Sequence, residues 1–133
     1  MDQPAGLISQ KSSHGVDETV RRLRAAIEAA GLTLFAEIDH DAGAVAAGLE
    51  LRPTRLVIFG AARGGTPLMQ AAQTAGIDLP LKTLVWQDAA GDCWIGYNAP
   101  QWIADRHGLG SGVDGPVNAM TQLLGKLTAT AAG

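Results

Sequence analysis

The stretch from Leu51 to Pro80, LRPTRLVIFGAARGGTPLMQAAQTAGIDLP, decides the fold of this chain. Its apolar run Thr54–Gly60 has hydrophobic side chains on both faces, which predicts a central strand that is covered on both sides. The segment Ala61–Gly65 then predicts a glycine-rich turn. Thr66 and Pro67 are a good N-cap and first helical residue. We therefore expect a strand that delivers a loop to a helix N-terminus, a place where a ligand can bind.

Hydrophobic periodicity predicts the other elements. Apolar residues at spacings of three and four indicate helices, and alternating runs indicate strands. The predicted strands are Leu7–Ser13, Leu32–His40, Thr54–Gly60, Lys82–Gln87 and Cys93–Asn98, and the last two form a hairpin through 88–92. The predicted helices run from Val16 to Gly31, over 41–49, from Pro67 to Gly76, from Pro100 to Gly108 and from Pro116 onward.

This order of elements predicts an α+β fold. Two longer helices bracket about five strands, an order typical of a mainly antiparallel sheet with the helices packed on one face. The opposite face must then be exposed or covered by a partner. The 133 residues suit a single domain spanning 1–133. We expect the Ala/Thr/Gly tail 128–133 to fray.

Composition limits the partners and the cellular compartment that we expect for this protein. Apolar residues make up 47% of the chain and charged residues 17%, which favours a compact fold over disorder. The net charge of -3 leaves no basic surplus for a phosphate backbone, so we expect no nucleic-acid partner. The sequence offers no long apolar run and no signal-like N-terminus, so we expect no membrane association. The single cysteine, Cys93, excludes an intramolecular disulfide and fits the cytoplasm.

Three blocks carry a resemblance to a known family. They are IDHDAGAVAAGLELRPTRLVIFG, GTPLMQAAQTAGIDLPLKTLVWQD and WIGYNAPQWIADRHGL. Together they resemble the small bacterial family called domain of unknown function 302. The resemblance implies a helix-grip or TATA-binding-protein-like fold, often dimeric, without a settled biochemical role. It directs attention to Asp39, His40, the turn Gly64–Thr66, Arg106 and His107.

The glycine-rich turn is the first candidate site. Gly64, Gly65 and Thr66 can present backbone N–H groups to an anion at a helix N-terminus, and Arg63 adds a positive charge. The turn lacks the lysine and the spacing of a phosphate-binding P-loop. The alternative is an ordinary tight turn before a capped helix.

Histidines are the second candidate. His40, next to Asp39, ends a predicted strand, and His107, next to Arg106, ends a predicted helix. Each can transfer protons near neutral pH, and two histidines from distant segments can ligate a haem iron. The alternative is that both are hydrogen-bonded structural residues. His14, between a serine and a glycine, is expected in an exposed turn.

Aromatic residues are the third candidate. Trp86, Trp94, Tyr97 and Trp102 lie within 17 positions of one another and can line a pocket or a dimer face, or pack in the core. Cys93 is expected to be a small buried hydrophobe without a lowered pKa.

Two functions follow from these candidates. The first is a homodimeric module that binds a small apolar or anionic ligand, with haem among the possibilities. The second is an enzyme in which His40 or His107 is the general base, with Asp39 orienting it or Arg106 holding an anionic substrate.

Overall fold

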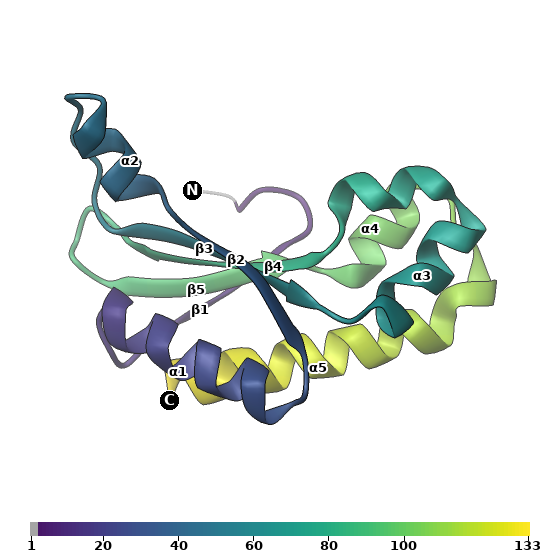
Figure 1. Ribbon diagram of the computed structural model, residues 1–133. Helices are drawn as coiled ribbons and strands as arrows, with labels where there is room; N and C mark the ends of the chain where they lie inside the picture. Colours follow the sequence, from purple (N-terminus) through teal and green to yellow (C-terminus); the bar gives the residue numbers. More distant parts are fainter. Residues whose placement is uncertain (1–2) are drawn as a thin grey trace.

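The computed structural model describes residues 3–133 (Figure 1). The strands are β1 (Leu7–Lys11), β2 (Thr33–Asp39), β3 (Thr54–Gly60), β4 (Leu81–Gln87) and β5 (Cys93–Asn98). The α-helices are α1 (Val16–Ala29), α2 (His40–Ala46), α3 (Ala62–Ala71), α4 (Pro100–Arg106) and α5 (Asp114–Ala132). The described residues also form two short 3-10 helices, η1 (Gln73–Asp78) and η2 (Ser111–Val113).

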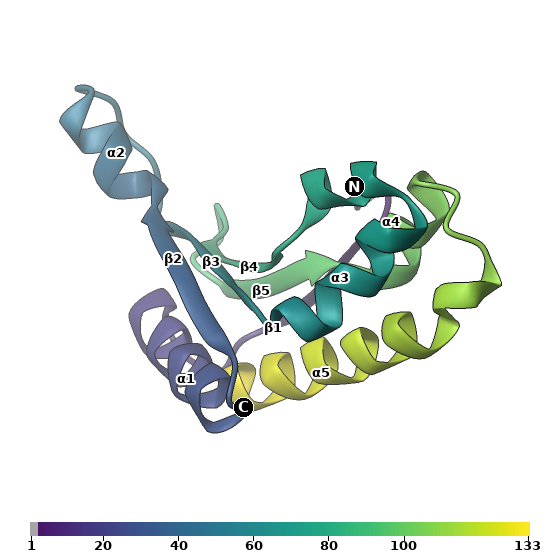
Figure 2. The ribbon, with the colours of Figure 1, turned by 45° about the vertical axis from the view of Figure 1, so that its right-hand side comes forward.

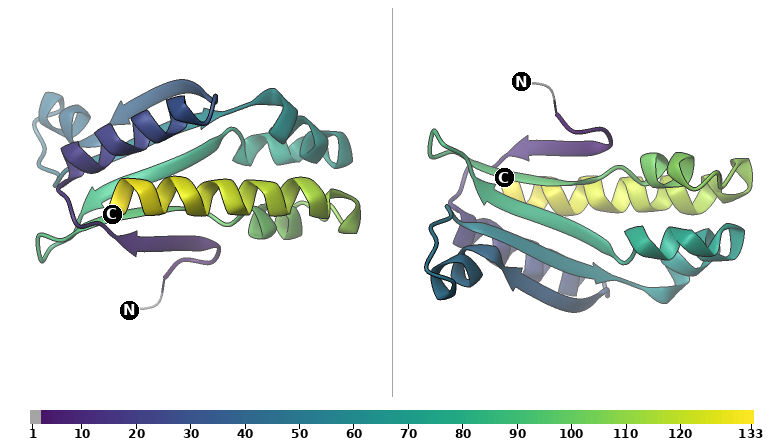
Figure 3. Two further views of the ribbon diagram at one scale, coloured as in Figure 1. Left: turned by 90° about the horizontal axis from the view of Figure 1, so that it is seen from below. Right: turned by 90° about the horizontal axis from the view of Figure 1, so that it is seen from above.

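The five strands form one antiparallel sheet in the order β1-β5-β4-β3-β2. The two long helices, α1 and α5, lie side by side under one face of it (Figure 3). The predicted α+β architecture is therefore confirmed. β4 is the middle strand, whereas β3, which we expected at the centre, is its neighbour.

Helix packing follows the sequence pattern. The inner face of α1 carries apolar residues that recur at helical spacing and are at most 7% exposed. They are Val16, Val20, Leu23 and Ile27. The helix stops before Gly31, whose φ of +72° is the left-handed conformation that glycine adopts at helix ends. The inner face of α5 is built in the same way from Val117, Met120, Leu124 and Leu127.

The two faces of the sheet differ sharply. Alternate residues such as Val57, Phe59 and Val85 point to the helices and are 0% exposed. Their neighbours, Leu56 and Ile58 among them, lie on the other face and are only partly buried. β3 is therefore covered on one side, and its two-sided apolar pattern misled the prediction. Figure 2 shows α2 rising at one end of this open face and α4 standing at the other.

The start of α3 corrects the predicted turn. The helix begins at Ala62, so Gly64, Gly65 and Thr66 lie inside it, and Thr66 is not its N-cap. The carbonyl of Ala61 accepts hydrogen bonds from the N–H groups of Gly64 and Gly65. Packing of this turn beside α5 outweighs the low helix propensity of glycine. The helix also ends at Ala71, and the tighter η1 replaces its predicted continuation.

The C-terminal tail also corrects an expectation. We expected 128–133 to fray, but α5 continues to Ala132. Ala131 and Ala132 are 0% and 2% exposed. The carbonyl of Ala132 accepts a hydrogen bond of 2.8 Å from the N–H of Ser13. Burial of small side chains against the sheet therefore keeps the last turn ordered.

Exchanging Ala131 for aspartate tests the role of this last turn. Ala131→Asp places a charge in a fully buried position and is expected to cost about 2–4 kcal/mol of unfolding free energy. Ala129→Asp is the matched control, because Ala129 is exposed on the same turn and meets the same helix dipole. Urea unfolding followed by circular dichroism gives both values. Equal losses in the two variants would contradict an ordered, buried tail.

Candidate functional site

The first predicted pair, Asp39 and His40, forms a helix cap. Asp39 is the N-cap of α2, and its Oδ1 accepts a hydrogen bond of 2.9 Å from the N–H of Ala42. Its Oδ2 lies 3.4 Å from Nε of Arg55. His40 is the first residue of α2 and is exposed. Asp39 thus orients the helix and makes no contact that would orient the imidazole of His40.

His107 lies far from His40 and has a different environment. It follows α4, whereas His40 opens α2 at the opposite end of the open sheet face (Figures 1 and 2). Nε2 of His107 lies 2.6 Å from Oδ2 of Asp78. Its Nδ1 lies 3.0 Å from Oγ1 of Thr74. The fold therefore does not bring the two predicted histidines together, and His107 instead joins α4 to η1.

Arg106 binds the same carboxylate. Its Nη1 donates to Oδ1 and Oδ2 of Asp78 at 2.9 and 2.8 Å. Its guanidinium carbon also lies 5.9 Å from the ring centroid of Trp102, within cation–π range. Arg106 side-chain exposure is 49%, so part of the guanidinium still faces solvent.

Asp78 is the carboxylate that Arg106 and His107 share. Burial alone would raise the pKa of its carboxyl, but hydrogen bonds from His107 and Arg106 and the positive charge of Arg106 hold that pKa below its ordinary value of 3.8. Asp78 is therefore ionised at neutral pH. Sequence reasoning singled out Arg106 and His107 but missed Asp78 and Thr74, because these lie about 30 positions earlier in the chain.

The residues of the predicted glycine turn separate in the helix. Arg63 and Thr66 are exposed, whereas Gly64 and Gly65 turn toward the interior. Their N–H groups are satisfied by Ala61 and do not point at a ligand. The glycines leave space open instead. A Cβ on Gly65 would fill part of that space, since it would lie in contact with Leu79 at 3.6 Å.

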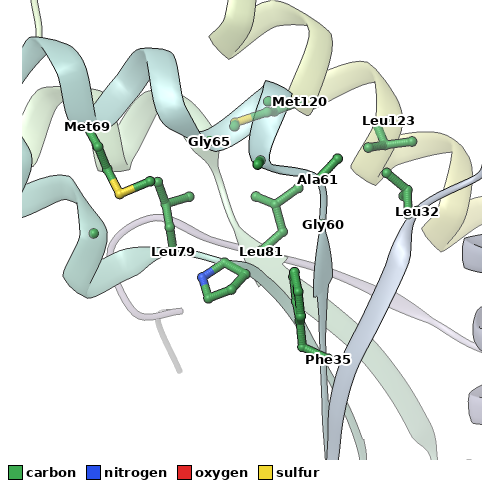
Figure 4. A pocket seen from close by; sticks show the side chains of 14 residues that line it. Leu32, Phe35, Gly60, Ala61, Gly65, Met69, Leu79, Leu81, Met120 and Leu123 are labelled. Carbon is green, nitrogen blue, oxygen red and sulfur yellow. The ribbon is translucent and has the colours of Figure 1, made fainter.

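That space belongs to an apolar cavity of about 290 Å³ at the end of β3 (Figure 4). Its walls come from the start of β2, the start of α3, the segment around η1 and the middle of α5. Every lining residue is leucine, phenylalanine, methionine, proline, alanine or glycine. They are Leu32, Phe35, Gly60, Ala61, Ala62, Gly64, Gly65, Met69, Gly76, Leu79, Pro80, Leu81, Met120 and Leu123.

Sequence reasoning found only two of these lining residues, Gly64 and Gly65. Leu32 and Phe35 come from the start of β2, and Met120 and Leu123 come from α5. Phe35 is 54% exposed, so part of its ring lies open to solvent at the edge of this cavity. A partial signal was available in the glycines that precede Thr66, since small residues leave room for a ligand.

The predicted aromatic residues do not share one pocket. Trp86 and Trp94 are directly opposite each other on β4 and β5, on the open face. Nε1 of Trp94 donates a hydrogen bond of 2.8 Å to Asp88. Tyr97 points to the helices and is 9% exposed. Trp102 lies in α4, beneath Gly6.

Two smaller expectations have clear outcomes. Cys93 is buried, its Sγ lies 3.6 Å from Oγ1 of Thr19, and burial raises the pKa of its thiol, as expected for an unreactive cysteine. His14 is partly buried, with Nε2 enclosed and unpaired among the described residues, so its prediction as an exposed turn residue was wrong.

Among residues 3–133, no group of three or more His, Cys, Asp and Glu side chains is placed to hold a metal ion. No helix in this part of the chain combines the length and the apolar character needed to cross a membrane.

Comparison with known proteins identifies the family. The model of the family described as "Domain of unknown function DUF302" matches residues 8–127. The chain belongs to the DUF302 family. A DUF302 protein from Bacillus stearothermophilus, described as an uncharacterized conserved protein, has a crystal structure with the same fold. It superposes with a TM-score of 0.84 at 16% identity, over 96% of this chain and 99% of that chain.

Curated relatives of this DUF302 chain are longer. It is 44% identical, over 129 residues, to proteins named Fluoride-specific ion channel FluC 1 in Brucella suis and Brucella abortus. The match covers 97% of this chain but only 51% and 48% of those proteins. The chain thus spans about half the length of the curated relatives that it matches.

Replacing Asp78 tests the cluster of Asp78, Arg106 and His107. Asp78→Asn is expected to lower the unfolding free energy at pH 6 by about 1–3 kcal/mol, because it removes charge-assisted hydrogen bonds. The pKa of Asp78 is lower in the folded protein than its ordinary value of 3.8. The stabilisation that Asp78 contributes is therefore fully present above pH 3.8, and it is lost as the pH falls through the pKa of the folded state.

The difference between wild type and Asp78→Asn should therefore shrink from pH 6 to pH 3. Urea unfolding at both pH values measures it. Asp105→Asn, an exposed acid on the neighbouring helix, is the control and should show little effect at either pH. A difference that stayed constant with pH would rule out the ionised carboxylate as the source of stability.

Proposed function

We propose that this chain is a module that binds a small apolar ligand in the cavity at the end of β3. The observation that carries the proposal is the lining, which includes no charged or hydrogen-bonding side chain. Such a cavity stays poorly hydrated, and an apolar molecule gains contact area when it enters. The exposed edge of Phe35 gives the ligand a route of approach.

The volume sets the size of the ligand. Ligand pockets commonly measure about 300–1,000 Å³, and an apolar cavity of about 150 Å³ binds benzene. The cavity here, about 290 Å³, lies at the lower limit of that range. We therefore propose a ligand of about two fused rings or a short alkyl chain, in preference to the anionic ligand considered from the sequence.

Haem does not fit this proposal. No histidine lines the cavity, His40 is exposed at the opposite end of the sheet face, and both ring nitrogens of His107 have partners. Axial ligation by either histidine would need a different site. Of the two histidines, only His107 has the partners that general-base catalysis requires.

We further propose that the module is a homodimer built on the open face of the sheet. This face carries the apolar side chains of Leu56, Ile58 and Trp86, and no helix formed by residues 3–133 covers them. The ring of Trp86 packs closely over Gly96, because a Cβ on Gly96 would lie only 3.2 Å from that ring. A two-fold interface uses the same patch on both subunits, so one continuous apolar face is enough to form it.

The longer relatives support a modular unit. Almost the whole chain has a counterpart within about half of each FluC-named protein, so the same unit occurs joined to other sequence. The channel name belongs to those longer proteins, and we propose no channel activity for this chain. A cytoplasmic location stays a prediction from the cysteine content.

Filling the cavity tests the ligand-binding proposal. In Gly65→Leu the new side chain points toward Leu79 and Met69 and occupies the cavity. Binding of 1-aminonaphthalene, which has the two fused rings of the proposed ligand size, is followed by its fluorescence and is expected to weaken at least about tenfold, which is the loss of about 1.4 kcal/mol. Replacing a helical glycine should raise stability by up to about 1 kcal/mol, so unfolding would not explain the loss.

Gly43→Leu is the matched control. Gly43 is also a helical glycine, and nothing lies within 4 Å of its Cβ position. This variant should bind the probe as the wild type does. Absence of probe binding to the wild type, or equal binding by Gly65→Leu, would refute the proposal.

A charge on the open face tests the dimer. Ile38 faces Leu56 on this side of the sheet and is 40% exposed. Ile38→Lys is expected to turn a dimer into a monomer in sedimentation equilibrium, because the interface would bury an unpaired charge. Leu34→Lys is the control, since Leu34 is 38% exposed on the same edge strand and faces Phe59 on the other side. A monomeric wild type would end the proposal.

A further inference from the structure

Three side chains form a hydrogen-bonded line between η1 and α4. Oγ1 of Thr74 lies 3.0 Å from Nδ1 of His107, and Nε2 of the same ring lies 2.6 Å from Oδ2 of Asp78. A hydroxyl, an imidazole and a carboxylate in hydrogen-bond sequence are the parts of an activated nucleophile. The order is recognised by geometry and not by fold or by position in the chain.

The carboxylate determines the tautomer of the imidazole. Asp78 is ionised at neutral pH, and an ionised carboxylate can only accept hydrogen bonds. The proton between them must therefore lie on Nε2 of His107. In the neutral ring Nδ1 then carries a lone pair and accepts the hydroxyl hydrogen of Thr74. This is the arrangement that draws a proton away from a nucleophilic hydroxyl.

Accessibility suits the same roles. Thr74 is exposed on η1, whereas the side chains of His107 and Asp78 are only 8% and 12% exposed. The hydroxyl can meet a substrate while the groups behind it are held. Arg106, 49% exposed, adds a positive charge at the same carboxylate, and it can attract a negatively charged oxygen in its vicinity.

We propose that Thr74, His107 and Asp78 form an acyl-transfer site that hydrolyses small esters. This activity goes beyond ligand binding in the cavity and does not depend on it. Oγ1 of Thr74 attacks the ester carbonyl carbon as its proton passes to Nδ1 of His107. The tetrahedral intermediate collapses, the ester C–O bond breaks, and the leaving alcohol takes the proton from Nδ1. Water, activated by the same nitrogen, then releases the carboxylic acid and restores Thr74.

The same contacts also tie η1 to α4, so the test must separate activation from stabilisation. An alkyl fluorophosphonate does so, because an activated hydroxyl forms a P–O bond with it and expels fluoride. Intact mass and peptide mapping then locate the label. We expect the wild-type chain to carry one label, on Thr74.

Variants assign the roles. Thr74→Val removes the hydroxyl and should abolish the label, whereas Thr74→Ser should retain it. His107→Gln leaves the hydroxyl in place and should slow labelling at least about 100-fold, the usual contribution of a general base. Thr66→Val is the matched control, since Thr66 is an exposed threonine on α3, and labelling should be unchanged.

Two results would overturn the proposal. One is a wild type that takes no label, and the other is a His107→Gln variant, folded by circular dichroism, that is labelled on Thr74 at the wild-type rate. The second result would mean that the contacts among Thr74, His107 and Asp78 only stabilise the fold. Failure of Gly65→Leu to weaken probe binding would affect the cavity alone, so the two proposals fail separately.

Discussion

The structure depends on one packing arrangement, in which α1 and α5 cover a single face of a five-stranded sheet. The two helices differ in length, with 14 residues in α1 and 19 in α5. At 1.5 Å per residue, α5 extends about 7 Å further. Figure 3 shows its surplus length reaching beyond the sheet to α3 and α4. The cavity forms in this region, where α5 has no α1 beside it and is met instead by the start of α3.

Sequence patterns could predict the regular layer because its physics is local. The inner residues of α1 repeat at helical spacing, and the hairpin of β4 and β5 is bounded by turn residues at 88–92. The start of α3 could not be predicted in this way. Pro67 in a sequence favours the first turn of a helix, yet here five residues precede it, because a contact with α5 stabilises a turn that contains two glycines.

The candidate sites also contain some residues that the sequence could single out and others that it could not. Arg106 and His107 could be singled out from the sequence as charged and titratable residues at a helix end. Their partners could not, because Thr74 and Asp78 become neighbours of α4 only when η1 folds back against it. The cavity is the extreme case, since its walls come from four separate parts of the chain and are made of residues that sequence reasoning assigns to the core.

The segment 73–79 links the cavity to the cluster of polar residues. Gly76 and Leu79 contribute to the apolar lining, while Thr74 and Asp78 of the same segment face His107. Asp78 is the last residue of η1 and Leu79 follows it directly, so one short stretch of backbone contributes both to the cavity wall and to the polar cluster. The hydrogen bonds of Asp78 to Arg106 and His107 hold this stretch of backbone against α4. The contacts that position His107 beside Thr74 therefore also fix the part of the cavity wall that Gly76 and Leu79 supply.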